Sequence, residues 1–205
     1  MSKMMELLGD MKKHHASICE QLEGCVGKEK SAEILMDIPA PSGEEAPPER
    51  AVWAAQVSSC LERSLDKEQI VQVRQGCSCV KANKYSLYNK KHFPQIRQAH
   101  PDEEEYMQAV AAFLSGRPRI GAKVEYADGK FTTYLGERNG CGCLVVKGGW
   151  ERPTSTTWCY CCQGALFSIY QFVFPEKACH MEIVETHATG GEDCIFSTWY
   201  TDKEG

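Results

Sequence analysis

No stretch of this sequence approaches the ~20 consecutive apolar residues that a helix needs to cross a bilayer. The N-terminal region places Lys12, Lys13, His14 and His15 where a secretory signal peptide would carry its apolar stretch. Basic residues are also scarce, since 23 of them stand against 28 acidic residues and the formal net charge is −5. Without a basic surplus, the chain is poorly suited to neutralising the phosphates of nucleic acid. We therefore expect a cytoplasmic protein that binds neither membranes nor nucleic acid.

Cysteine is the residue that the chain has in excess, with 12 among 205 residues and no internal repeat to account for them. Hydrophobic (42%) and charged (25%) residues occur at ordinary globular levels, so the core does not depend on covalent cross-links. Structural disulfides are rare in a reducing compartment, which makes metal ligation or thiol chemistry the leading explanation for the cysteines. Free cysteine also fills core volume as a small hydrophobe. We expect that role for Cys19, Cys25, Cys60 and Cys179.

The first half of the chain is predicted to be largely helical. Apolar residues recur close to helical spacing over residues 3–24. Further helices are predicted over 48–65, 66–76, 85–96 and 101–116. Between the first two helices, the segment 38–48 combines proline, glycine and charge, which predicts an exposed connector. We therefore expect a helical extension with its connector over residues 1–49 and an α+β cysteine-rich domain over residues 50–205.

The second half changes to the period of two that is typical of strands. Apolar residues alternate on both sides of Asp128-Gly129, a pair that favours a tight hairpin turn. A short strand is predicted over 141–146, a helix over 158–173, and a closing hairpin over 181–200 around Gly190-Gly191. This order predicts an α+β fold, in which a helical N-terminal half is followed by an antiparallel sheet packed with a C-terminal helix.

The strongest chemical pattern is Cys141-Gly142-Cys143 followed by Cys159-Tyr160-Cys161-Cys162. Residues two apart on a strand share a face, and residues three apart share a face in a helical turn. Cys141, Cys143, Cys159 and Cys162 are therefore predicted to converge if the strand and the helix pack together. Four thiolates hold zinc in closed sites, and they also hold iron–sulfur clusters, so the pattern leaves both metals open.

A third cysteine pair leaves the ligand set open. Cys77 and Cys79 follow a predicted helix, and either one is an alternative to Cys143 or Cys161 as a ligand. The candidate metal ligands are thus Cys141, Cys143, Cys159, Cys162, Cys77, Cys79 and Cys161. Beside them, Phe167, Tyr170 and Phe174 recur at helical spacing, which favours either core packing or the wall of an apolar small-molecule pocket.

Two other mechanisms use the same cysteines and leave open whether the protein is an enzyme. A thiol near a helix N-terminus is activated by the helix dipole, which favours a thiol-dependent hydrolase with a nucleophile in 159–162. Its base would be His180 or His187, oriented by Glu182 or Glu185. A redox-active thiol protein would instead form a reversible disulfide within one of the cysteine pairs.

Four stretches of the C-terminal half, 141–143, 157–164, 184–186 and 190–196, resemble an uncharacterised family of cysteine-rich bacterial proteins. That family is distantly similar to the 4-vinyl-reductase-type small-molecule-binding domains. The resemblance extends over roughly residues 70–200, as judged from motif matching. It implies an α+β ligand-binding fold that is often a homodimer. A second related group hydrolyses a cyclic thiazoline amino acid, which implies the hydrolase activity by analogy alone.

The same resemblance implies a particular zinc site. In the sensor members, zinc is held by an upstream cysteine, a glutamate on the closing hairpin and two hairpin cysteines. These positions correspond here to Cys159 or Cys162, to Glu182 or Glu185, and to Cys194. The middle hairpin cysteine is absent from this chain. His187 is the nitrogen ligand that would take its place.

Overall fold

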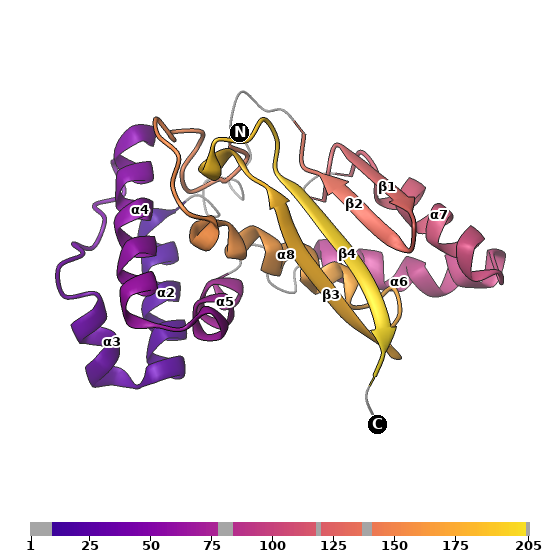
Figure 1. Cartoon of the computed structure of the whole chain (residues 1–205), viewed down its shortest axis with the longest axis horizontal. Helices are drawn as coiled ribbons and strands as arrows, with labels where there is room; N and C mark the ends of the chain where they lie inside the picture. The colour runs from indigo at the N-terminus through magenta and orange to yellow at the C-terminus, as the bar shows by residue number, and fades with distance from the viewer. Residues whose placement is uncertain (1–9, 78–83, 118–119, 137–140, 204–205) are drawn as a thin grey trace.

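The computed structural model describes residues 10–77, 84–117, 120–136 and 141–203 (Figure 1). A helical N-terminal half is followed by a four-stranded antiparallel sheet with a C-terminal helix, which confirms the predicted α+β class. The helices of the first half are α2 (Met11–Val26), α3 (Lys28–Ile34), α4 (Pro47–Ser64), α5 (Lys67–Gly76), α6 (Lys84–Ala99) and α7 (Glu103–Leu114). No helix within the described residues is long and apolar enough to span a membrane.

The helix boundaries follow from local capping chemistry. Side-chain carboxylates of Asp10, Asp66 and Asp102 accept backbone N–H bonds at the starts of α2, α5 and α7. These bonds satisfy amide groups that have no partner inside the helix. Gly27 ends α2 with a φ of 85°, a conformation that glycine adopts without steric cost. Pro47 occupies the first position of α4, where its missing N–H is harmless.

The sheet has the strand order β1-β2-β4-β3 and is antiparallel throughout. Its strands are β1 (Lys123–Ala127), β2 (Lys130–Tyr134), β3 (Lys177–Glu185) and β4 (Ile195–Asp202). Asp128 and Gly129 turn the first hairpin with positive φ angles of 51° and 75°, as the sequence predicted. The short helix η1 (Thr156–Cys159) and helix α8 (Tyr160–Tyr170) precede β3, and η2 (His187–Thr189) precedes β4.

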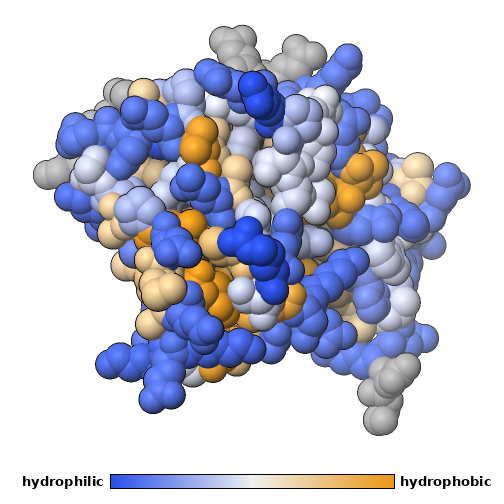
Figure 2. All heavy atoms as spheres, turned by 60° about the vertical axis from the view of Figure 1, so that its left-hand side comes forward, coloured by the Kyte–Doolittle hydropathy of each residue, from blue (hydrophilic) through white to orange (hydrophobic). Residues whose placement is uncertain are grey.

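Helix α8 lies between two hydrophobic clusters, with α5 on one side and β3 on the other (Figure 1). The helical cluster includes Trp53, Leu61 and Trp158, packed among α2, α4 and α5. The sheet cluster includes Phe131 and Phe196. On the face of the N-terminal helices, hydrophilic residues predominate and hydrophobic residues show only as small separate patches (Figure 2).

The prediction of a strand over residues 141–146 is wrong. This segment forms a turn, in which the Lys147 N–H donates to the Cys143 carbonyl at 2.8 Å. Directly after this segment, Lys147 and Gly148 take positive φ angles of 53° and 77°, which complete the turn. Val145 and Val146 are buried in the helical cluster, so burial rather than strand pairing accounts for their apolar character.

The predicted connector is a loop, but packing holds it against α4. Ile38 and Pro41 are buried rather than exposed. The indole N–H of Trp53 donates to the Pro39 carbonyl at 3.1 Å. Arg50 donates to the Glu45 carbonyl at 2.7 Å. The connector therefore follows the surface of α4 in a fixed conformation.

Candidate functional site

Six cysteines from three parts of the chain meet where α8 lies against the sheet and the helical cluster. They come from the segment after residue 140, from the η1–α8 junction and from the residue directly before β4, and we call them the thiol cluster. Its members are Cys141, Cys143, Cys159, Cys161, Cys162 and Cys194. Each of them interacts electrostatically with at least one other member. The structure thus brings Cys141, Cys143, Cys159 and Cys162 into one neighbourhood.

Thiols on the turn and directly before β4 form a chain of hydrogen bonds. The Cys143 thiol donates to the Cys141 sulfur, and the Cys141 thiol donates to the Cys194 sulfur. Backbone amides also point at two of these atoms, since the Cys143 N–H donates to the Cys141 sulfur and the Val146 N–H to the Cys143 sulfur. N–H donors favour the ionised form of a thiol. The turn therefore places thiolate-stabilising groups inside the cluster.

The helical side of the cluster is equally well defined. The Thr186 hydroxyl donates to the Cys159 sulfur, and both residues are buried. The Cys161 thiol donates to the carbonyl of Cys77 at 3.4 Å. Cys77 donates its own thiol to the Val73 carbonyl at 3.1 Å, so its sulfur is directed back along α5. Cys77 is thus a neighbour of the cluster, whereas Cys79 lies outside the described residues.

Burial and thiol–thiol repulsion raise the pKa values of four cluster members, Cys141, Cys143, Cys159 and Cys162. Burial raises the pKa of Cys159 to about 12 and that of Cys162 well above its ordinary value. The pKa of Cys143 is also raised well above its ordinary value, first by the hydrogen bond that its thiol donates to Cys141 and then by burial. The bond from Cys143 lowers the pKa of Cys141, but its own bond to Cys194 and burial outweigh this, so the net shift is upward. Without a bound metal ion, these four thiols are protonated at neutral pH.

Two of the four residues proposed for the hydrolase, His180 and Glu185, are engaged elsewhere. His180 lies on β3, where its Nε2 is 2.7 Å from the Thr201 hydroxyl. The Glu185 carboxylate accepts backbone N–H bonds from Glu192 and Asp193, at 2.6 and 3.0 Å, and so braces the turn before β4. His187 lies in η2, and its buried Nε2 has no hydrogen-bond partner among the described residues. Glu182 is exposed on β3.

Two residues of the predicted aromatic wall, Tyr170 and Phe174, lie in the sheet cluster. Tyr170 is fully buried, with its hydroxyl 2.7 Å from the Thr133 hydroxyl. Phe174 packs edge-on against Tyr106 and Tyr200, with ring centroids 5.4 and 5.2 Å apart. Phe167 is half-buried. In the described part of the chain, Tyr170 and Phe174 therefore occupy core positions.

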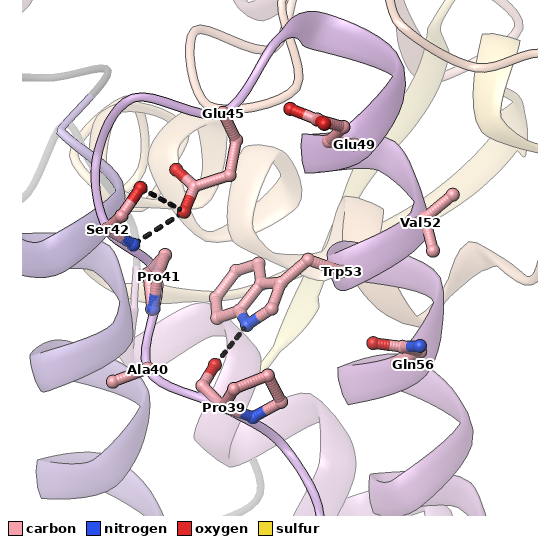
Figure 3. Close-up of a pocket in the computed structure, with 9 residues that line it drawn as sticks. All are labelled: Pro39, Ala40, Pro41, Ser42, Glu45, Glu49, Val52, Trp53 and Gln56. Atoms are coloured by element: carbon pink, nitrogen blue, oxygen red, sulfur yellow. Dashed lines mark hydrogen bonds between the residues drawn. The ribbon is translucent and has the colours of Figure 1, made fainter.

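A surface pocket of about 430 Å³ lies between the connector and α4 (Figure 3). It is lined by residues 39–42 and 45 of the connector and by Glu49, Val52, Trp53 and Gln56 of α4. Glu45 is held in place by the Ser42 hydroxyl at 2.9 Å and the Gly43 N–H at 3.0 Å. The composition of the connector predicted a loop there, but no sequence pattern predicted that the loop and helix enclose a hollow.

Cys194 is the cluster member that the cysteine spacing did not predict. It lies more than 30 residues from Cys162, on a different element, and only the family resemblance pointed to it. Within residues 10–77, 84–117, 120–136 and 141–203, no three side chains of His, Cys, Asp or Glu already stand at the positions of metal ligands. What the chain provides is a group of neighbouring thiols.

A protein-family model matches residues 10–203, which is nearly the whole chain, and its description is "Family of unknown function (DUF6144)". Searches of curated proteins and of solved structures gave no match. The match agrees with the expectation of an uncharacterised family. It does not support the expected resemblance to 4-vinyl-reductase-type domains.

Proposed function

The chain belongs to this family of unknown function (DUF6144), and we propose that it binds a metal ion through the thiol cluster, with zinc as the first candidate and an iron–sulfur cluster as the second. The observation that carries this proposal is the meeting of six thiols from three segments in one enclosed place. Soft thiolate ligands select zinc and iron–sulfur clusters over hard cations. In the cytoplasm, which we propose as the location, the thiols stay reduced and available.

The ligands that fit best are Cys141, Cys143, Cys159 and Cys162. The turn supplies the first two with N–H donors, and Thr186 supplies Cys159 with an O–H donor. Such outer contacts orient the ligands of metal sites and tune their basicity. A divalent cation offsets the mutual repulsion of the thiolates and displaces their protons. Cys194, which accepts from Cys141, is the nearest replacement for any of the four.

Metal analysis of anaerobically purified protein tests the proposal. We expect about one zinc per chain, or iron together with sulfide, because closed four-thiolate sites retain their metal. The double variant C141S/C159S should lose that metal. C19S is the matched control, since the Cys19 sulfur lies on α2, 3.7 Å from His15 and away from the cluster. A metal-free wild-type chain with unchanged unfolding in the presence of a chelator would contradict metal binding.

A specific contact also favours small-molecule sensing, through the surface pocket between the connector and α4. The Arg50 guanidinium donates to Gly43 and Glu45 carbonyls of the connector pocket, and to the Val145 carbonyl of the cysteine turn at 3.3 Å. A ligand that moves the connector is thereby coupled to the turn that carries Cys141 and Cys143. Thermal-shift screening of small molecules should yield binders whose effect disappears when Q56W fills the pocket. Binders that act equally on Q56W would place the ligand elsewhere.

A further inference from the structure

Arg74 is a fully buried cation on α5 without an anionic side chain beside it. Its Nη2 donates to the Trp158 carbonyl at 3.0 Å, its Nη1 lies 3.4 Å from the His14 Nε2, and its guanidinium lies 4.1 Å from the Trp158 ring centroid. Its Nε has no hydrogen-bond partner among the described residues. Every ion pair of that part of the chain joins a lysine to a carboxylate, and none includes Arg74.

Neither His14 nor Trp158 compensates the positive charge of Arg74. Burial, followed by the charge of Arg74, lowers the pKa of His14 well below its ordinary value, so the imidazole is neutral at physiological pH. The Trp158 carbonyl and ring provide partial negative charge only. An arginine does not lose its proton inside a protein. A buried charge without a partner strongly disfavours the folded state, so a position of this kind indicates negative charge nearby.

The thiol cluster is the place where the negative charge that balances Arg74 would develop. Arg74 donates to the residue directly before Cys159, and its charge acts on the Cys159 thiol. Cys159 in turn interacts with Cys141, Cys143 and Cys162. A neutral cluster would leave Arg74 unpaired. A divalent metal bound by four thiolates carries a net charge of about −2, because four S–H protons leave and two positive charges arrive.

We propose that Arg74 is the built-in counter-charge of the thiol cluster, and that it selects a metal site made of four deprotonated cysteines over one completed by a neutral histidine. This inference rests on the proposed metal binding. Arg74 acts as a positioning residue rather than a ligand, through its charge and its bond to the carbonyl that precedes Cys159.

Zinc titration of metal-free protein against a competing chelator tests the inference on wild type, R74M and R74K. R74M should bind zinc 10- to 100-fold more weakly, the range of losses seen when outer partners of metal ligands are removed. Its metal-free form should unfold at the same temperature as wild type or higher, because a buried unpaired charge has been replaced by an apolar side chain. R74K, which keeps the charge, should recover most of the affinity.

The outcomes separate the two proposals. If wild type binds no zinc, both fail. If wild type and R74M bind zinc equally, metal binding stands and the role of Arg74 is refuted. A purely structural role predicts a lower unfolding temperature for metal-free R74M with unchanged affinity. If R74M does not fold, R74Q replaces it, because glutamine removes the charge and retains an N–H donor for the Trp158 carbonyl.

A cobalt-substituted wild type tests the ligand set. Its spectrum should show the intense sulfur-to-metal absorption of four thiolates, and a weaker, mixed-ligand spectrum would overturn the selection of four cysteines.

Discussion

The side-chain amide of Gln75 on α5 donates a hydrogen bond of 3.0 Å to the side-chain carbonyl of Gln163 on α8. Gln163 donates in turn to the backbone carbonyl of Met181 on β3 at 2.8 Å. One side chain thus connects the helical half to the sheet, and it directly follows Cys161 and Cys162. The positions of these cysteines depend on how closely α5 and α8 approach.

Gly164 sets that approach, so enlarging it should destabilise the protein. A Cβ atom at this position would lie 2.8 Å from the backbone of Gln75, closer than packed atoms come. G164A should therefore lower the free energy of unfolding by about 1–3 kcal/mol, as overpacking typically does. Urea unfolding measures the change. G24A is the control, because no atom lies within 4 Å of that Cβ position and alanine stabilises a helix interior by roughly 0.5–1 kcal/mol. Equal effects of the two variants would show that the helices separate freely.

The buried hydroxyl pair Tyr170–Thr133 tests whether Tyr170 belongs to the core or lines a ligand pocket. The two oxygens lie 2.7 Å apart and both residues are fully buried. T133V leaves the tyrosine hydroxyl without its partner, which should cost about 1–3 kcal/mol of unfolding free energy. The double variant T133V/Y170F should recover part of that loss, because no polar group is left unpaired. A change in T133V below about 0.5 kcal/mol, the usual range for surface substitutions, would indicate that water reaches Tyr170.

Stability should fall with acid below about pH 6.5, the ordinary histidine pKa, because of His14. Burial first, then Arg74 and His15, lower the pKa of His14 in the folded state. The unfolded chain therefore takes up the proton at higher pH than the folded chain. The contribution of neutral His14 is complete above the unfolded pKa and is lost as pH falls, by up to about 1.4 kcal/mol per pH unit.

Urea unfolding at pH 7.5, 6.5 and 5.5 measures this dependence. H14F should flatten the profile between these values. H180Q is the control, because His180 lies on β3, where it contacts Thr201 rather than Arg74. An H14F profile as steep as that of wild type would assign the proton uptake to another group.

Local chemistry explains which parts of the fold the sequence predicted. The cap at Asp66 and the turn at Asp128-Gly129 are decided by a few adjacent residues, and both formed as expected. The segment 141–146 has the apolar content of a strand, but Val145 and Val146 found their partners in the helical cluster rather than in the sheet. An apolar pattern in the sequence predicts that side chains are buried. It does not predict which part of the protein they pack against, because that depends on the tertiary structure.

In the candidate site, too, local relationships could be predicted from the sequence and tertiary ones could not. Cysteines within one short segment, such as Cys159 and Cys162, could be expected to meet because local geometry relates them. Cys194 lies directly before β4 and Arg74 lies on α5, so both are brought to the cluster by tertiary contacts that no local pattern encodes. A buried arginine also has no sequence signature, since arginine is ordinarily a surface residue.

Thiol reactivity separates metal binding from the hydrolase alternative. Alkylation requires the thiolate, and burial raises the pKa of Cys159 to about 12 and that of Cys162 well above its ordinary value. With substoichiometric iodoacetamide at pH 7.5, mass spectrometry should therefore find the half-buried Cys25 labelled before either of them. Zinc loading should slow the cluster cysteines further and leave Cys25 unchanged, because the cation withdraws electron density from a ligated sulfur and makes it a weaker nucleophile. An activated nucleophilic cysteine would instead be labelled first. Preferential labelling of Cys159 or Cys162 in the folded protein would therefore favour the hydrolase, provided that H187Q reduces the labelling rate.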